Sequence, residues 1–246
     1  MKGHIPVWVY DFAHSVANVP FLKRLLKPLY YQYKDNMSRR RQQYFKDNSL
    51  EILKAFDKCM IDNGFEYCLI FGTLLGAIRE KGFIPHDFDL DVALFIEDRS
   101  PKLHSVLKNN GFSLRHRFII GDGQLGCEET FEYRDTGVTI DIFYICPAIN
   151  ELPYVCCWNY GAGCATYRET MKRYGGVTPR RIELPFNHKT KRIAFESIEV
   201  NIPDNSHVIS EFCYGPSYMI PNPNYIVPTE HRVVWDEMKA SFEEFN

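Results

Sequence analysis

Hydrophobic residues recur along this chain at two different spacings, and turn-forming residues separate the segments. From Ser49 to the Asn63-Gly64 pair, apolar residues stand three or four positions apart, which predicts a capped amphipathic helix that stops at the glycine. A second helix is predicted from Ser100-Pro101 to Gly111, because serine caps a helix and proline fits its first turn. Runs rich in β-branched and aromatic residues predict strands over residues 65–71, 87–95, 112–120, 127–134 and 138–145.

These elements follow one another as helix, strand, short helical turn, strand, helix and then a β meander. That order predicts an α/β protein of the α+β type, with a mixed sheet flanked by helices. Residues 146–176 hold cysteine, glycine and aromatic residues without a sustained period, so we expect an irregular, cysteine-containing insertion there, either a loop or a small subdomain. Strands near 180–184 and 192–200 follow, then a short helix that Ser206 caps and an extended tail over 221–228.

Charge is spread unevenly along the chain. The 246 residues include 29 Lys plus Arg and 31 Asp plus Glu, so no overall basic field favours nucleic-acid binding. Residues 18–46, however, contain eight lysines and arginines but only one acidic residue, Asp35, and apolar residues are interleaved among them at near-helical spacing. We therefore divide the chain into a basic amphipathic arm over 1–48, interrupted at Pro28, and a folded domain over 49–246. The arm is either a helix packed on the domain or a contact for an anionic membrane surface.

The sequence carries no sign of export or of membrane insertion. Apolar residues near the N-terminus end at Asp11 before a signal sequence can form, and no run reaches the roughly 18 apolar residues of a membrane span. The eight cysteines are too dilute for a disulfide scaffold, so we expect reduced thiols or metal ligands. We therefore expect a cytoplasmic protein whose basic arm makes any peripheral contact with the inner membrane face.

Acidic residues mark the predicted strand over 87–95. Residues two apart on a strand share a face, so Asp87, Asp89 and Asp91 line up while Leu90 and its neighbours enter the core. Three like charges repel one another when they lose water, so we expect a cation beside them, and a hard divalent ion with oxygen ligands fits. The bland alternative for Asp89 and Asp91 is a pair of surface carboxylates on an edge strand. Asp87 either supports a metal ligand or shapes its loop.

A further carboxylate, Asp141, interrupts the apolar run over 138–144. If its strand neighbours the first, Asp89, Asp91 and Asp141 converge on one spot, as a two-metal phosphoryl-transfer site requires. The alternative is a buried acid bonded to a neighbouring loop. Upstream, Gly72 and Thr73 lie where a strand meets a helical turn, so their backbone N–H groups could cradle a phosphate. Arg79 either clamps a phosphate or pairs with an acid.

Three consecutive stretches form a recognisable pattern: residues 71–79 (FGTLLGAIR), 81–85 (KGFIP) and 87–91 (DFDLD). This pattern resembles the LicD family of phosphotransferases, which includes the fukutin-related proteins. The later stretches 140–143 (IDIF) and 212–215 (FCYG) resemble further landmarks of the family in the expected order, so the resemblance spans roughly residues 50 to 220. His86 and Phe88 depart from it, because the family often has an aromatic residue and a run of three acids there.

The resemblance implies a nucleotidyltransferase-like catalytic domain and a metal-dependent reaction. A phospho-alcohol such as phosphocholine, ribitol phosphate or glycerol phosphate would pass from its CDP-activated form to a sugar hydroxyl of a cell-surface glycan, free or lipid-linked, and CMP would be released. On this interpretation Asp89, Asp91 and Asp141 are the catalytic residues and the ligands of Mg²⁺ or Mn²⁺. Donor binding would involve Gly72, Thr73 and Arg79.

Other functions stay open at this point. A nucleotidyltransferase that attaches the nucleotide itself would release pyrophosphate instead of CMP. A glycosyltransferase would leave the Gly-Thr element and Asp141 unexplained, and a non-catalytic membrane or partner adaptor would depend on the basic arm alone. Fukutin-related proteins carry a zinc-binding cysteine loop, and the insertion here holds four cysteines without paired spacing, so structural zinc and ordinary thiols are both considered. These cysteines are Cys146, Cys156, Cys157 and Cys164.

Overall fold

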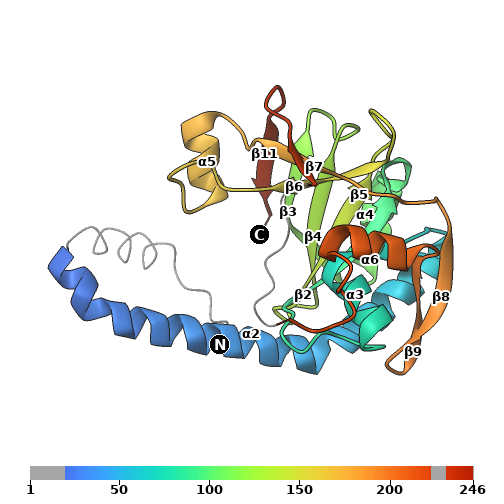
Figure 1. Cartoon of the computed structure of the whole chain (residues 1–246), viewed down its shortest axis with the longest axis horizontal. Helices are drawn as coiled ribbons and strands as arrows, with labels where there is room; N and C mark the ends of the chain where they lie inside the picture. Colours follow the sequence, from blue (N-terminus) through green and yellow to red (C-terminus); the bar gives the residue numbers. More distant parts are fainter. Residues whose placement is uncertain (1–19, 223–230, 246) are drawn as a thin grey trace. The chain divides into compact units, whose positions relative to one another are not determined.

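In the computed structural model, which describes residues 20–222 and 231–245, the chain divides into two compact units, residues 1–43 and 44–246. A mixed sheet of six strands lies at the centre of the second unit (Figure 1). Its strand order is β1-β2-β5-β4-β3-β11; β2 and β5 are parallel, and every other neighbouring pair is antiparallel. The strands are β1 (Cys68–Leu69), β2 (Asp89–Phe95), β3 (Phe112–Ile120), β4 (Cys127–Tyr133), β5 (Thr139–Ile145) and β11 (Ala240–Glu244). The predicted mixed sheet flanked by helices is confirmed.

The first long helix, α2, spans Pro20–Asn63 without a break. The predicted interruption at Pro28 and the predicted start at Ser49 are therefore wrong. A proline removes one backbone hydrogen bond, which a long helix can tolerate, and Ser49 is a buried interior residue of the helix. The stop at Gly64 is confirmed, since its φ of +72° lies in the left-handed region that ends helices. The apolar side chains predicted between residues 21 and 30 lie outside the described side chains.

One face of the sheet is apolar and is covered by helices. Alternate residues of β2 and β5 are fully buried on this face, and in α2 the side chains of Phe56 and Met60 are buried as well. The α4 helix (Pro101–Asn109) adds Leu103 and Leu107, and Ser100 caps it by accepting a hydrogen bond from the Leu103 N–H, as predicted. The opposite face of the same strands therefore carries the remaining side chains, including the acidic ones.

The predicted irregular insertion contains regular structure. It holds β6 (Tyr154–Trp158) and α5 (Tyr167–Tyr174), and β6 joins β7 (Pro179–Glu183) and β10 (Arg232–Val234) in a three-stranded sheet. The cysteine and aromatic residues of β6 are buried almost throughout, so no alternating pattern marks the strand in the sequence. Residues 192–200 likewise form a hairpin instead of one strand, because the chain reverses at Glu196, where φ is +49°.

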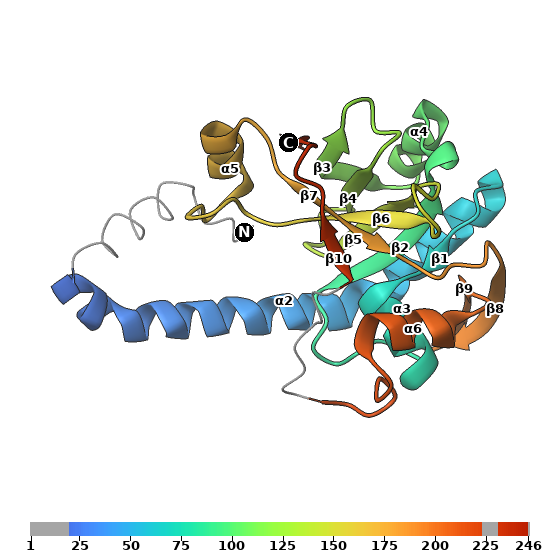
Figure 2. The same ribbon diagram turned by 45° about the horizontal axis from the view of Figure 1, so that its top comes forward.

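A short helix lies beside the acidic end of β2, because the N–H of Gly72 at its start bonds to Asp91. The predicted strand over 65–71 shrinks to β1, because α3 (Phe71–Arg79) already begins at Phe71. Figure 2 shows α3 beside α6 (Ser206–Tyr214) and the hairpin of β8 (Thr190–Phe195) and β9 (Ile198–Pro203). Asn205, and not Ser206, occupies the N-cap of α6.

Residues 223–230 of the predicted tail lie outside the described residues. No helix in the described ranges combines the length and apolar character needed to cross a membrane.

Candidate active site

The structure brings the three predicted catalytic aspartates to one face of the sheet. Asp91 of β2 lies directly opposite Asp141 of β5, its parallel neighbour, and Asp89 precedes Asp91 by two residues on the same strand. The predicted adjacency of the two strands is therefore confirmed. Asp87 lies in the loop before β2 and not on the strand, yet its carboxylate reaches the same spot beside Gly72.

The electrostatics of this cluster are those of crowded like charges. Burial raises the pKa of Asp91 well above its usual range, and the charges of Asp89, Asp141 and Asp87 raise it further. A hydrogen bond from the Gly72 N–H works against this shift. The pKa of Asp87 is raised to about 7 by burial and by the charge of Asp89, while Arg79 lowers it. Without a cation, the folded protein therefore favours the protonated forms of Asp91 and Asp87.

The first residues of α3 form hydrogen bonds with Asp91. The Gly72 N–H donates to Asp91 Oδ2 at 3.2 Å, and the Asp91 N–H donates to Thr73 Oγ1 at 2.9 Å. Phe71 adopts a φ of +47°, a costly conformation for a bulky residue, and its ring packs edge-on against Phe143. Gly72 thus orients the Asp91 carboxylate in this structure, and Thr73 holds the backbone of the same residue. Their predicted contact with a phosphate stays a prediction.

Arg79 lies at the other end of α3 with 11% of its side chain exposed. Its Nε pairs with Glu80 Oε1 at 2.7 Å, and one of its terminal nitrogens donates to the Tyr218 carbonyl at 3.5 Å. Its charge also acts on Asp87. Pairing with acids, one of the two roles expected from the sequence, is therefore what the structure shows; a role in donor binding stays a prediction.

Two residues of β4 complete the acidic face, and neither was predicted from the sequence. Burial raises the pKa of Glu128 well above its usual range, and the charge of Asp141 adds to the effect. Thr130, two residues further along the strand and therefore on the same face, lies opposite Asp141 and donates to its Oδ1 at 2.6 Å. The alternation of side chains along a strand would have placed Glu128 and Thr130 on the same face of the sheet. Only the order of the strands shows that this face is the one that carries Asp91 and Asp141.

The donor set suits a hard divalent cation, because carboxylate oxygens are the ligands that Mg²⁺ and Mn²⁺ prefer. Each aspartate also raises the free energy of its charged neighbours, a cost that a cation would remove. Among the described residues, however, no three His, Cys, Asp or Glu side chains are already gathered into a group that could hold a metal ion. The carboxylates would therefore have to draw together around a bound ion.

The cysteines of the insertion form no such group in the described residues either. Cys146 and Cys156 are buried, and Cys157 and Cys164 are partly exposed; all four are free thiols. Burial raises the pKa of Cys146 and of Cys157 to about 11. Zinc releases the protons of the thiols that it binds, so these pKa values do not bear on zinc binding, and structural zinc in this segment stays a prediction.

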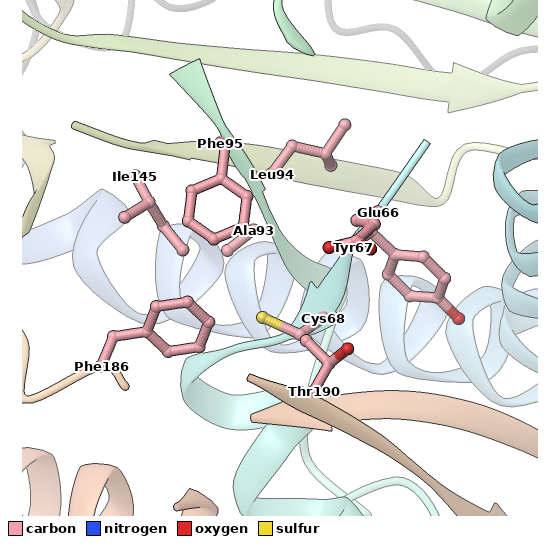
Figure 3. Close-up of a pocket in the computed structure, with 9 residues that line it drawn as sticks. All are labelled: Glu66, Tyr67, Cys68, Ala93, Leu94, Phe95, Ile145, Phe186 and Thr190. Atoms are coloured by element: carbon pink, nitrogen blue, oxygen red, sulfur yellow. The ribbon is translucent and has the colours of Figure 1, made fainter. Parts of the chain in front are cut away.

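Two hollows in the described part of the chain lie apart from the acidic face. One is a cavity of about 10 Å³ near the far end of β2. Figure 3 shows the residues that line it, among them Cys68, Phe95 and Phe186. The cavity has room for about one water molecule. A groove of about 360 Å³ lies between α3, the β8–β9 hairpin and α6. Neither hollow is lined by the acidic residues of β2, β4 and β5.

The sheet topology and the acidic face fit a domain of the nucleotidyltransferase class, and comparison with known proteins identifies the family. Residues 64–205 match the family model described as LicD/FKTN/FKRP, nucleotidyltransferase domain. Since the match covers more than half of the chain, the protein belongs to this family. The match includes every residue of the acidic face.

Several curated proteins are similar to this chain. A mouse protein named ribitol-5-phosphate transferase FKTN is 28% identical over 190 residues, which are 73% of this chain and 37% of the mouse protein. Its human counterpart is 26% identical over 190 residues, with the same shares. An uncharacterized Caenorhabditis elegans protein, T07A5.1, is 31% identical over 129 residues, 52% of this chain and 34% of that protein. The matched region thus spans little more than a third of these relatives.

Proposed function

We propose that this protein transfers a phospho-alcohol from a CDP-activated donor to a sugar hydroxyl of a glycan. Family membership supports this proposal, and relatives that are 26–28% identical carry the name ribitol-5-phosphate transferase. The structural observation that carries it is the placement of Asp91 opposite Asp141 on parallel neighbouring strands, with Asp89 on the same face. Ribitol phosphate is therefore the first alcohol to test, followed by phosphocholine and glycerol phosphate.

In the proposed reaction, the acceptor oxygen forms a bond to the phosphorus that carries the alcohol. The bond from that phosphorus to the bridging pyrophosphate oxygen breaks, CMP leaves with the electron pair, and the hydroxyl proton passes to Asp141. Mg²⁺ or Mn²⁺ bound by Asp89, Asp91 and Asp141 would offset charge on the pyrophosphate and lower the pKa of the acceptor hydroxyl. Gly72 and Thr73 hold Asp91 in place for this role, since both are bonded to it.

A nucleotidyltransferase that attaches the nucleotide itself is the second candidate, because the same class of domain can support either reaction. The two differ in their products. Phospho-alcohol transfer releases CMP from a CDP-alcohol, whereas nucleotidyl transfer from a nucleoside triphosphate releases pyrophosphate. A non-catalytic adaptor would release neither product, and it would have no need of an acidic face.

The experiment is a donor screen with the purified chain. CDP-ribitol, CDP-choline and CDP-glycerol are each incubated with candidate glycans and Mg²⁺, and CMP release and the mass of the glycan are measured. We expect CMP release that requires both Mg²⁺ and the acceptor, together with a glycan heavier by one phospho-alcohol. The matched pair of variants is Asp91→Asn and Asp122→Asn. Asp122 is an exposed turn residue, so its variant keeps activity while Asp91→Asn loses it. Pyrophosphate as the product, or no Mg²⁺ dependence, would contradict the proposal.

A further inference from the structure

Four side chains lie directly opposite one another across four neighbouring strands of the sheet. His116 of β3 pairs with Thr130 of β4, Thr130 pairs with Asp141 of β5, and Asp141 pairs with Asp91 of β2. A register shift between Leu114 and His116 in β3 sets this alignment, since it brings His116 opposite Thr130. Neither His116 nor Thr130 takes part in the bond-making and bond-breaking steps proposed above.

Hydrogen bonds connect the first three members of this row. Thr130 Oγ1 lies 2.6 Å from Asp141 Oδ1 and 3.0 Å from His116 Nε2. The Thr130 hydroxyl has one proton to give, and an ionised carboxylate can only accept. When Asp141 is ionised, as a metal ligand is, the hydroxyl proton points to Asp141, and His116 donates its Nε2–H to the hydroxyl oxygen. The donors run in one direction, from His116 through Thr130 to Asp141.

The surroundings hold this chain of donors in place. Thr130 is 2% exposed, so bulk water does not compete for the hydrogen bonds of its hydroxyl group. The His116 ring packs against Phe118 and Phe242, with centroid distances of 5.9 and 5.6 Å. Burial lowers the pKa of His116, although Glu244 opposes the shift, so the neutral ring is favoured at neutral pH. A neutral imidazole carries one proton, and the geometry puts that proton on Nε2.

We propose that His116 and Thr130 are positioning residues that fix the orientation of the Asp141 carboxylate for the transfer reaction. The inference rests on the proposed function, because it assigns Asp141 a part in catalysis. With Oδ1 held by Thr130, rotation of the Asp141 carboxylate about its Cβ–Cγ bond is restricted, so the plane of the carboxylate is fixed. Side chains that orient a metal ligand in this way raise metal affinity and activity by about 10- to 100-fold.

The first test determines which nitrogen of His116 carries the proton in the unmodified protein with Mg²⁺ present, because a bound cation keeps the Asp141 carboxylate ionised. Histidine labelled with ¹⁵N reports by NMR which ring nitrogen carries a proton, and the His116→Gln variant assigns the signal. We expect a proton on His116 Nε2. A bare Nε2 would have to accept from Thr130, which would leave no hydroxyl proton for Asp141, and the inference would fall.

The second test compares Thr130→Val with Thr130→Ser. Valine keeps the shape and removes the hydroxyl, whereas serine keeps the hydroxyl. We expect Thr130→Val to lose about 10- to 100-fold in kcat and in Mn²⁺ affinity, and Thr130→Ser to recover most of both. Thr170→Val is the matched control, since Thr170 is a threonine of α5 that is also buried, with 1% exposed. Parent-like Mn²⁺ affinity and kcat in Thr130→Val, or no recovery in Thr130→Ser, would overturn the positioning role.

If Thr130→Val does not fold, the same comparison moves to His116. The His116→Leu variant removes the donor to Thr130, and His116→Gln supplies an amide N–H in its place, so rescue by glutamine is the expected result. The proposed function fails separately: a parent protein without Mg²⁺-dependent CMP release would remove both ideas. An active parent whose Asp91→Asn variant is inactive, but whose Thr130→Val variant is not, would remove the positioning role alone.

Discussion

We expect Gly72→Ala to lower the activity of this protein strongly and to leave its stability almost unchanged. A methyl group at Gly72 would lie 3.4 Å from Asp91 Oδ2 and 3.5 and 3.7 Å from the carboxylate oxygens of Asp87. These are ordinary van der Waals distances, so the methyl fits without a clash. It would nevertheless fill the space between the two carboxylates and the start of α3, where we place the donor phosphates and the metal ion.

The expected stability change is small. Alanine is favoured over glycine in a helix by up to about 1 kcal/mol, and Gly72 lies in the first turn of α3, where the gain is smaller. Further loss of water from Asp91 works in the opposite direction. A Tm within about 3 °C of the parent is therefore expected, because 1 kcal/mol shifts the Tm of a chain this long by about 2–4 °C. The expected loss of kcat/KM is about 100-fold or more, since displacement of reacting groups by 1 Å has that effect.

Gly76→Ala is the matched comparison, because it makes the same substitution in the same helix. Its methyl would lie 2.5 Å from the Gly82 carbonyl oxygen, which is too close for any real contact. We expect this variant to lose stability and Gly72→Ala to keep it. Thermal unfolding, CMP release and Mn²⁺ titration of both variants check the contrast. Parent-like kcat/KM in a folded Gly72→Ala protein would refute the placement of the donor site at the start of α3.

Three other predictions concern single carboxylates. Asp89→Ala and Asp91→Ala should abolish turnover while the fold persists, which activity and circular dichroism will show; turnover within a few-fold of the parent would contradict the site. Asp141→Asn should lower kcat by at least about 100-fold, and a double variant with Asp89→Ala should lose little more than Asp89→Ala alone, as kinetics can test. Glu129→Gln should lower the free energy of unfolding by about 3 kcal/mol at pH 7 and by less below pH 4, measured by urea titration.

The sign of that last pH dependence follows from the contacts of Glu129. Burial alone would raise its pKa, but hydrogen bonds from His104 and Tyr144 and the charge of Arg99 outweigh burial and hold the pKa below the ordinary 4.5. A lowered pKa in the folded state means that the ionised group stabilises the fold above its unfolded pKa. The contribution is lost as the pH falls through the folded pKa. A difference between parent and variant that stays equal from pH 7 to well below pH 4 would contradict this explanation.

Capping residues and the alternation of apolar and polar residues were enough to predict individual helices and strands. Serine and proline at 100–101 fixed the start of α4, and alternation fixed β2, so the two-residue spacing of Asp89 and Asp91 was enough to place them on one face. Asp141 could be added because one charge in an apolar strand is costly without a partner. These inferences needed only neighbours in the sequence.

Long-range pairing accounts for what the sequence did not show. β11 joins the sheet by pairing residues 240–244 with residues 116–120, more than a hundred positions away. β6 is buried along most of its length and therefore lacks the alternation by which a strand is recognised. Thr130 and His116 acquire their roles from the order β2-β5-β4-β3, which brings residues of four strands into one row. No periodicity in the sequence specifies that order.

The consecutive glutamates of β4 lie on opposite faces of the sheet, one in a network that stabilises the fold and the other beside the proposed catalytic acids. Glu129 points to the helix-covered face, where it is fully buried and accepts from Tyr144 at 2.7 Å while it pairs with His104 at 2.8 Å. Glu128 points to the other face, where Asp141 is the first of several like charges that raise its pKa. Two identical side chains, one residue apart, thus have pKa values displaced in opposite directions. Because the network around Glu129 stabilises the strands from one side, the opposite side can keep a set of mutually repelling carboxylates that folding alone would disfavour.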